Sequence, residues 1–352
     1  MSVATDELVL RFADPGGRFV AVRLLSDLFK RSDPPGFAWD EDEAAWTLRR
    51  PWPASVTRLE YLLELEDLAG RLRLATDPEN PLRAPGPFGD RSVLELPEYV
   101  RPGWVDDDEA PPGTLRGLRL RSRRLRREVG GLLWEPPDTD PTEPLPLLVA
   151  HDGPEYAEYS YLTRFLESMT AELELPPLRA ALLHPVERDE HYSASARYST
   201  ALVRELIPAL ERRTRTPRDR AARVGVGASL GGLAMLHAHR MHPDSFGGLF
   251  LQSGSFFRQR FDSQESRFGR FQRVARFVGT VLRDRSWSHP IPIAMTCGTG
   301  EENLANNRAV RDALAAQGYP AVLDEHPDAH NWVSWRDTFD PHLLGFLQRL
   351  WD

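Results

Sequence analysis

The feature that most constrains the fold is a glycine-rich turn between a short apolar strand and a helix. The sequence Arg-Val-Gly-Val-Gly-Ala-Ser-Leu-Gly-Gly occupies positions 223–232, and residues 233–238 continue as a predicted helix. Gly-x-Ser-x-Gly in this context is typical of a nucleophile elbow, a sharp and strained turn that needs small flanking residues. Gly227 and Gly231 meet that need. The pattern predicts an exposed Ser229 Oγ at a helix N-terminus, where free N–H groups favour a developing negative charge.

The pentapeptide alone also fits an ordinary glycine-rich turn with a capping serine, so the rest of the chain must decide. Beyond residue 113, buried apolar strands alternate with helices of ten or more residues. Strands are predicted at 146–150, 178–183, 246–251, 291–296 and 321–323, and helices at 161–173, 195–213, 268–278, 304–316 and 334–350. This alternation predicts a mostly parallel sheet with helices on both faces. With the elbow in the middle of the series, we expect an α/β-hydrolase fold over residues 114–352.

The first hundred residues have a different pattern. Short alternating strands are predicted at 8–12, 19–24, 46–49, 59–65 and 72–74, separated by turns rich in Gly, Pro and Asp. Several short strands at this spacing predict a small all-β sandwich over residues 1–101. Residues 102–113, rich in Pro and acidic residues, are the expected linker.

Composition and charge exclude several classes of protein. The formal net charge of −8 gives no support for nucleic-acid binding, and Cys297, the only cysteine, rules out an internal disulfide. The apolar flanks of Cys297 predict a buried strand thiol. His237, His239 and His242 do not share one helix face, which favours surface or capping roles over metal binding. Residues 1–7 lack the basic and apolar regions of a secretory leader, and no stretch is apolar enough to span a membrane, so we expect a cytoplasmic protein without membrane contact.

Two later loops offer partners for the serine. Glu301 and Glu302 follow the strand that ends near Cys297, and His330 follows the last predicted strand. The chain order Ser, acid, His is the order of this fold. The serine needs a base, and the base needs a carboxylate on its other ring nitrogen. We therefore predict a triad of Ser229, His330 and one of the two glutamates. His326 also lies nearby, but the adjacent proline indicates a residue at a strand end.

With these residues in view, the chain resembles the enterochelin esterase family, bacterial serine esterases that open catecholate siderophore trilactones. The resemblance covers nearly the whole chain, including an N-terminal immunoglobulin-like module. The similar motifs are the segments 227–232 (Gly-Ala-Ser-Leu-Gly-Gly), 298–301 (Gly-Thr-Gly-Glu), 329–336 (Ala-His-Asn-Trp-Val-Ser-Trp-Arg), 188–208, 77–81 and 92–97. The match implies Glu301 as the acid in preference to Glu302, and His330 in preference to His326.

The resemblance also implies where an oxyanion would bind. The first donor is the Leu230 amide, and the segment after Asp152 supplies the second. Pro154 has no N–H to give, so the amide of Gly153 or Glu155 must serve. The chain departs from the family at two further positions, with Ala329 before the catalytic histidine in place of Gly and Asn331 after it in place of Asp.

These features predict a serine carboxylester hydrolase that works through an acyl-enzyme, without a metal or organic cofactor, on a small-molecule ester such as a catecholate siderophore. Residues placed near the pocket by their loop positions are Tyr156, Arg188, Arg258 and Trp332. Trp39 and Trp46 of the N-terminal module either reach the substrate or form the sandwich core. Esters of phenolic or carbohydrate groups, an acyltransferase resembling the mycolyltransferases, and a non-catalytic binding protein are the alternatives. The sequence does not determine the oligomeric state.

Overall fold

The computed structural model describes residues 7–29, 32–285 and 289–351. Most of the N-terminal segment considered for a leader lies outside these residues. Contacts divide the chain into two compact units. The sandwich unit comprises Met1–Arg101, Gly298–Glu301 and His326–Ser334; the α/β unit comprises Pro102–Cys297, Glu302–Glu325 and Trp335–Asp352. The predicted linker lies within the α/β unit, where Gly103–Asp106 form a short 3-10 helix (η1).

The sandwich unit contains two sheets, counted within its described residues. One has the strand order β1-β4-β3; the other has the order β2-β5-β8-β7, with β6 paired to β5. The strands are β1 (Glu7–Ala13), β2 (Phe19–Leu25), β3 (Ala38–Asp40), β4 (Ala45–Pro51), β5 (Arg58–Asp67), β6 (Leu72–Ala75), β7 (Arg83–Ala84) and β8 (Arg91–Glu95). Alternate side chains of β1 and β5, among them Leu8, Leu10 and Leu63, are buried in one apolar core. This arrangement confirms the predicted β-sandwich.

The segment 77–81 is a turn held by buried polar contacts. The Tyr61 hydroxyl donates to Asp77 Oδ2 at 2.7 Å, and the Asp77 amide donates to Ser92 Oγ at 2.8 Å. Asn80 Nδ2 donates to the Val93 carbonyl at 2.7 Å. Because each of these buried polar groups has a hydrogen-bond partner, the turn joins β5 and β8 without leaving those groups unpaired.

The sheet of the α/β unit has eight strands within the described residues, in the order β16-β15-β14-β13-β11-β12-β10-β9. Its strands are β9 (Thr114–Ser122), β10 (Arg127–Glu135), β11 (Leu147–His151), β12 (Arg179–Leu183), β13 (Arg223–Ala228), β14 (Gly248–Gln252), β15 (Ile293–Gly298) and β16 (Ala321–His326). Strands β11 to β15 pair in parallel, while β9 and β10 form an antiparallel hairpin. The continuous burial of β11 to β15, including Cys297, is what a sheet covered on both faces requires.

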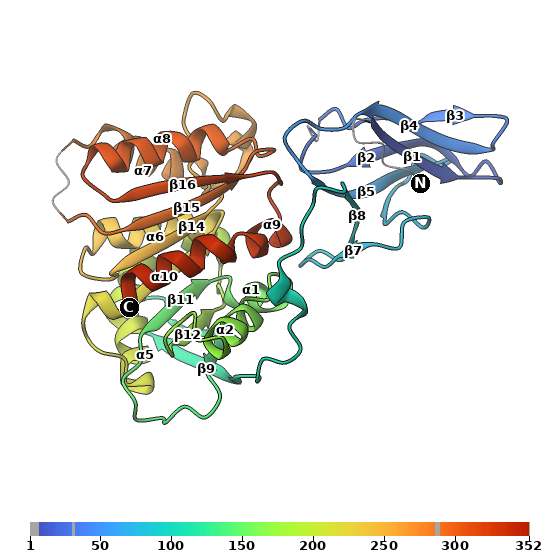
Figure 1. Ribbon diagram of the computed structural model, residues 1–352. Coiled ribbons are helices and arrows are strands. Elements are labelled where there is room, and N and C mark those ends of the chain that lie inside the picture. Colours follow the sequence, from blue (N-terminus) through green and yellow to red (C-terminus); the bar gives the residue numbers. More distant parts are fainter. Residues whose placement is uncertain (1–6, 30–31, 286–288, 352) are drawn as a thin grey trace. The chain divides into compact units, whose positions relative to one another are not determined.

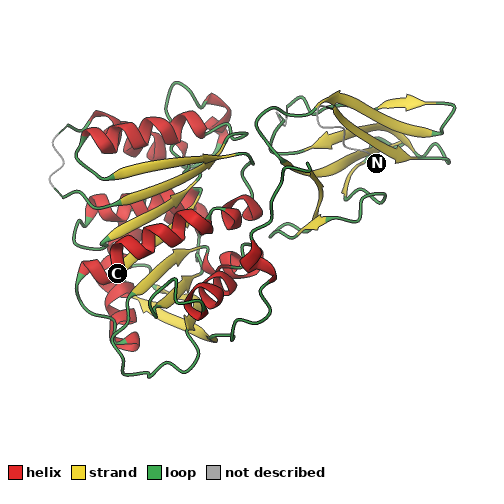
Figure 2. Ribbon diagram, in the orientation of Figure 1, coloured by secondary structure: helices red, strands yellow, loops and turns green. Residues whose placement is uncertain are grey.

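Helices cover both faces of this sheet, and Figure 2 shows the yellow strands between red helices. The helices are α1 (Gly153–Tyr159), α2 (Leu162–Ala171), α3 (Arg188–Tyr192), α4 (Ala196–Ala201), α5 (Ile207–Thr214), α6 (Leu230–Met241), α7 (Phe271–Arg283), α8 (Leu304–Ala316), α9 (Trp332–Asp337) and α10 (Leu344–Trp351). Side chains of α4, α6, α7 and α8 share one core with alternate strand residues such as Val149 and Leu251. On the other face, Phe250 contacts Phe346 of α10, which crosses the near side of the sheet in Figure 1. The α/β-hydrolase fold is thereby confirmed.

Several helices differ from the prediction. Helix α1 was not expected, and the helix expected over 195–213 has a wider turn at Leu202–Leu206 between α4 and α5. The closing helix, expected to be continuous over 334–350, is broken at Asp340, whose φ of −110° and ψ of 123° are not helical. Pro341 explains the break, because a proline forces the preceding residue out of the helical region. None of the described helices is both long and apolar enough to cross a membrane.

Candidate active site

Ser229 lies at the turn from β13 into α6, as the glycine pattern predicted. Its φ of 55° and ψ of −124° are a strained conformation for a residue with a side chain. Backbone contacts hold this conformation: the Ser229 amide donates to the Gln252 carbonyl at 2.9 Å, and the Ser255 amide donates to the Ser229 carbonyl at 3.1 Å. The neighbouring strand β14 and the loop after it therefore fix the serine from the side.

The glycines of the turn are required by close backbone packing. A Cβ on Gly227 would lie 2.5 Å from the carbonyl carbon of Gly231, and a Cβ on Gly232 would lie 2.9 Å from the Gly227 oxygen. The start of the helix therefore passes directly over the end of the strand. This approach makes the turn sharp enough to project Ser229.

The hydroxyl of Ser229 has a neighbour that the sequence did not reveal. Ser255 Oγ lies 3.0 Å from Ser229 Oγ, whereas Ser253 Oγ accepts a hydrogen bond from Trp335 Nε1 at 2.9 Å. This geometry distinguishes the two serines, because Ser255 contacts Ser229 whereas Ser253 contacts a tryptophan. The available signal was position, because Ser255 follows the strand beside the elbow and parallel strands end at the same edge of a sheet.

Two helix N-termini supply backbone amides at this edge of the sheet. Leu230 is the first residue of α6, and Gly153 is the first residue of α1 after Asp152, which is left-handed with φ 49°. The amides of a first helical turn make no bonds within their own helix, so they suit an anion. Pro154 occupies a position in this turn where a missing N–H costs the helix nothing. Gly153 must be glycine, because a Cβ would lie 2.2 Å from Leu182 Cα.

His151 ties the end of β11 to the elbow. Its Nδ1 lies 3.0 Å from the Gly231 carbonyl oxygen, and its Nε2 lies 2.9 Å from the Tyr198 hydroxyl. Burial lowers the pKa of His151 to about 4, so the ring is neutral near pH 7. A carbonyl only accepts, so Nδ1–H donates to Gly231 and Nε2 accepts from Tyr198.

Arg188, expected near the substrate, forms a bidentate ion pair with Asp152. Its Nε lies 3.0 Å from both carboxylate oxygens, and its NH2 nitrogen lies 2.7 Å from Oδ2. The Asp152 side chain is nearly inaccessible, whereas 38% of the Arg188 side chain is exposed. The pair therefore anchors the loop that leads into Gly153.

Glu301 and His330 form a hydrogen-bonded pair. Nδ1–H of His330 donates to Glu301 Oε2 at 2.7 Å, and the Gly298 amide donates to Glu301 Oε1 at 2.8 Å. Both carboxylate oxygens of this buried residue are thus used. With Nδ1 protonated, the lone pair of the neutral ring is on Nε2, the tautomer that a general base needs. Glu302 is exposed on the following turn.

The remaining predicted residues have different surroundings. His326 ends β16, as expected, and its Nε2 lies 2.6 Å from Ser334 Oγ. Tyr156 is fully buried, and its hydroxyl donates to Gln252 Oε1 at 2.6 Å, which places this side chain in the core. Arg258 and Trp332 are both half-buried. The Arg258 guanidinium carbon lies 4.2 Å from the centre of the exposed Phe261 ring.

The three α6 histidines have separate partners. His237 Nδ1 lies 2.7 Å from Ser199 Oγ, and His239 Nε2 lies 3.3 Å from the Tyr319 hydroxyl. His242 caps the helix, as expected, but His237 and His239 are buried, so a surface position was wrong for them. Among the described residues, no group of three or more His, Cys, Asp or Glu side chains is arranged to hold a metal.

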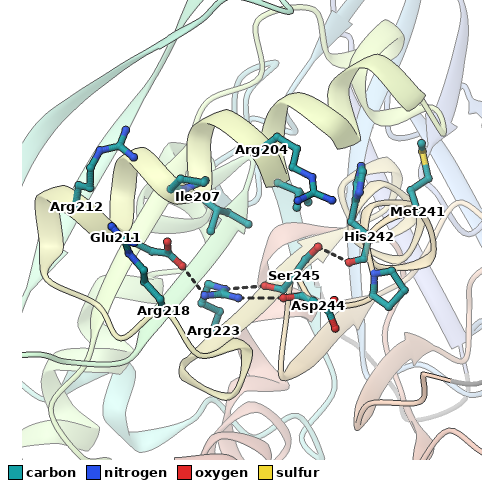
Figure 3. Close-up of a pocket in the computed structure, with 13 residues that line it drawn as sticks. Arg204, Ile207, Glu211, Arg212, Arg218, Arg223, Met241, His242, Asp244 and Ser245 are labelled. Atoms are coloured by element: carbon teal, nitrogen blue, oxygen red, sulfur yellow. Dashed lines mark hydrogen bonds and ion pairs between the residues drawn. The ribbon is translucent and has the colours of Figure 1, made fainter.

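The α/β unit also contains a pocket of about 470 Å³. Figure 3 shows the side chains that line it. It is lined at its floor by Arg223, whose guanidinium pairs with Glu211 and donates to the Ser245 carbonyl at 2.7 Å. Arg223 begins β13 and Ser229 follows its end, so the pocket and the serine are roughly 20 Å apart along the strand. The pocket therefore lies at the amino-terminal end of β13, opposite to the end that carries Ser229.

Comparisons with known proteins show the family to which the chain belongs. Residues 122–346 match the model of the family described as "Putative esterase". The chain is 32% identical over 187 residues to an iron(III) enterobactin esterase of Escherichia coli, covering 51% of this chain and 46% of that protein. It is 28% identical over 245 residues to an iron(III) enterobactin esterase of Dickeya dadantii, covering 66% of this chain and 55% of that protein. The chain thus spans about half the length of the curated relatives it matches.

A solved structure is similar over the full chain. The enterobactin esterase of Shigella flexneri, solved in the presence of enterobactin, has a TM-score of 0.77 and 21% identity, covering 100% of this chain and 95% of that one. This likeness describes the fold. Taken with the family match over residues 122–346, it shows that the chain belongs to the "Putative esterase" family and confirms its resemblance to the enterochelin esterases.

Proposed function

We propose that this protein is a serine carboxylester hydrolase in which Ser229 is the nucleophile, His330 the base and Glu301 the group that orients the imidazole. The observation that carries the proposal is the strained Ser229, with φ 55°, at the turn from β13 into α6. Such strain persists only where the surrounding structure enforces it, and it clusters at active sites. The 2.7 Å bond between His330 and Glu301 supports the assignment of base and acid.

The reaction follows from these roles. His330 Nε2 takes the proton from Ser229 Oγ as the oxygen attacks the ester carbonyl, and the Glu301 carboxylate stabilises the imidazolium. The imidazolium then gives its proton to the departing alcohol, which leaves an acyl-enzyme. Water, deprotonated by His330, attacks the acyl carbon, and Ser229 is regenerated with release of the acid.

We assign the oxyanion to backbone amides. Leu230 at the start of α6 is the first donor, and Gly153 or Glu155 at the start of α1 is the second, since Pro154 has no N–H. The proposal gains support from the Asp152–Arg188 and His151–Gly231 contacts, which hold α1 and α6 rigidly at their N-termini.

For the substrate, we propose a small-molecule ester of the catecholate siderophore class. The support is the similarity to proteins named iron(III) enterobactin esterases. Arg258 and Trp332 are proposed substrate contacts because both are half-buried, and Arg188 because 38% of its side chain is exposed. Hydrolysis of each lactone ester would consume one water and leave a carboxylic acid on one side of the cleaved bond and a free hydroxyl on the other.

Intact-mass spectrometry after incubation with a fluorophosphonate tests the proposal. We expect one adduct on the wild type and none on Ser229→Ala, because only an activated serine attacks phosphorus. Product analysis with enterobactin, a feruloyl ester and a simple aryl ester, each with and without a sugar acceptor, then separates hydrolysis from acyl transfer. An unlabelled wild type beside a labelled control esterase would refute the triad and favour a binding protein.

A further inference from the structure

We propose that Arg58 is a positioning residue for His330: it anchors the histidine-bearing loop to the β-sandwich. This inference rests on the proposed function, because it gives Arg58 its effect through the catalytic base. It also goes beyond that function, since it assigns the N-terminal strands a part in catalysis. All residues involved belong to the sandwich unit, which includes the segments Gly298–Glu301 and His326–Ser334.

The contacts of Arg58 reach the residues on both sides of His330. Arg58 begins β5 and is only 2% exposed. Its NH1 nitrogen donates to Glu60 Oε1 at 2.7 Å and to Asn331 Oδ1 at 3.4 Å. The same nitrogen lies 3.9 Å from Asp328 Oδ2. One guanidinium group therefore contacts the loop two residues before the histidine and one residue after it.

The loop itself is braced by the two side chains that Arg58 contacts. Asp328 Oδ1 accepts from the Ala329 amide at 2.7 Å and from Asn331 Nδ2 at 3.0 Å. Asn331 Oδ1 accepts from the Ser334 amide at 2.8 Å, at the first turn of α9. These bonds close a ring of contacts around the backbone of His330, so a displacement at Arg58 is transmitted to the imidazole.

Backbone contacts fasten the same loop to the start of β5. The Thr57 amide donates to the Pro327 carbonyl at 2.9 Å, and the Thr57 hydroxyl lies 3.3 Å from the same oxygen. The loop that carries the acid is fastened as well, because the Thr299 hydroxyl donates to the Ser55 carbonyl. Residues 55–58 thus contact both the acid loop and the histidine loop.

The backbone of the acid loop also packs closely against side chains of the sandwich. A Cβ on Gly300 would lie 2.4 Å from Leu28 Cδ2 and 2.8 Å from Val56 Cγ1. The Gly300 amide also donates to the Asp328 carbonyl at 3.0 Å, which joins the acid loop to the histidine loop. The sandwich therefore packs directly against the backbone next to Glu301.

The positive charge of Arg58 lies among three carboxylates. Its guanidinium faces the carboxylates of Glu60, Glu95 and Asp328, at 2.7, 3.5 and 3.9 Å. Glu60 and Asp328 are nearly inaccessible, so without Arg58 they would be two buried like charges. Burial raises the pKa of Asp328 to about 7, and the Arg58 charge acts against that rise. Loss of the cation would thus disturb the carboxylate that braces the loop.

The test compares Arg58→Gln and Arg58→Lys with a matched control, Arg23→Gln. Arg23 also pairs with two glutamates of the sandwich, at 3.1 Å to Glu64 and 2.8 Å to Glu66. These partners lie on β5 away from the histidine loop, and 32% of the Arg23 side chain is exposed, so the control reports the cost of losing a two-carboxylate ion pair at a more exposed position of the sandwich. The measurements are kcat and KM for an aryl ester and hydrogen exchange of peptides covering 326–334.

We expect Arg58→Gln to lower kcat by about 10- to 100-fold, because small displacements of a catalytic group have effects of this size, while KM changes less than about 3-fold. Exchange of the 326–334 peptides should accelerate. Arg58→Lys should recover part of kcat, and Arg23→Gln should stay within about 2-fold of the wild type in all three quantities. Asn331→Ala, which removes the loop-side contact together with the Asn331 bonds to Asp328 and Ser334, should lower kcat as Arg58→Gln does. Arg58→Lys carries the test if Arg58→Gln fails to fold.

The proposal is overturned if folded Arg58→Gln and Asn331→Ala keep the kcat and exchange rates of Arg23→Gln, or if Arg23→Gln loses as much activity as they do. The proposed function fails in a different way. In that case the wild type neither hydrolyses esters nor reacts with the fluorophosphonate, whereas hydrogen exchange still reports whether Arg58 anchors the loop.

Discussion

Glu301 uses each of its two carboxylate oxygens for a different donor. Oε2 accepts from His330 and Oε1 accepts from the Gly298 amide. A glutamine at this position has one acceptor and one NH2 group, so it cannot satisfy both donors. If its NH2 group faces the imidazole, Nδ1 becomes the acceptor and the proton moves to Nε2, which is then unable to act as a base.

Glu301→Gln should therefore lower kcat/KM by about 10²- to 10⁴-fold, the range expected when the tautomer of a catalytic histidine is wrong. The fluorophosphonate labelling rate should fall in parallel. Glu302→Gln is the matched control, since Glu302 is the exposed neighbour and should keep the wild-type rate within about 2-fold. Equal rates for the two variants would remove Glu301 from the triad.

At the scale of elements, the strands and their order along the chain could be predicted because a strand buried on both faces has a continuous run of apolar residues. Strands β11 to β15 are buried throughout, and their apolar runs are correspondingly continuous. Helix α8 was predicted at its observed bounds, whereas the break at Asp340 was missed although Pro341 signalled it. Helix α1 was missed because Gly153 and Pro154 look like a loop.

The contacts of the candidate site were predictable only in part. The glycine pattern predicted Ser229, strand order predicted His330 and one of the two glutamates, and the resemblance to the enterochelin esterases selected Glu301. The Arg58–Asn331 contact joins residues 273 positions apart, and no local pattern reports such a pair. The Ser229–Ser255 contact was missed for the same reason, since it depends on the pairing of β13 with β14.

Helix α1 offers a test at this scale, because its first residue packs against a strand. In Gly153→Ala the new Cβ would meet Leu182 Cα at 2.2 Å, and backbone cannot yield as a side chain does. We expect a loss of about 1–3 kcal/mol in stability, typical of overpacking, and slower fluorophosphonate labelling because the oxyanion amides shift. Gly130→Ala on β10 is the control, since its Cβ would meet nothing within 4 Å. Matching melting temperatures and labelling rates would contradict this account.

At the scale of the whole molecule, buried neutral histidines make stability depend on pH. Burial lowers the pKa of His151, His237 and His239 to about 4, against about 6.5 in an unfolded chain. Between these values the unfolded chain binds more protons than the folded one. The stabilisation is therefore complete above pH 6.5 and is lost progressively as the pH falls towards 4.

His237→Asn tests this dependence, because asparagine can keep a polar group at the Nδ1 position facing Ser199. Between pH 7 and pH 5 one such histidine should cost about 2 kcal/mol of stability. Urea titrations at pH 7 and pH 5 should thus show that the free energy of unfolding falls less for the variant than for the wild type, by about that amount. An equal loss of stability in His237→Asn and the wild type would argue against a buried neutral ring.

The grouping of the loops 298–301 and 326–334 with the first 101 residues bears on how such proteins can be recombined. A chimera that exchanges only residues 1–101 keeps the native loops but removes Arg58, Thr57 and Val56, to which those loops are fitted. The part that must be exchanged as a whole therefore consists of three segments that are separate in the sequence: residues 1–101, 298–301 and 326–334. A chimera keeps these contacts only if the sandwich strands, the acid loop and the histidine loop all come from the same parent protein.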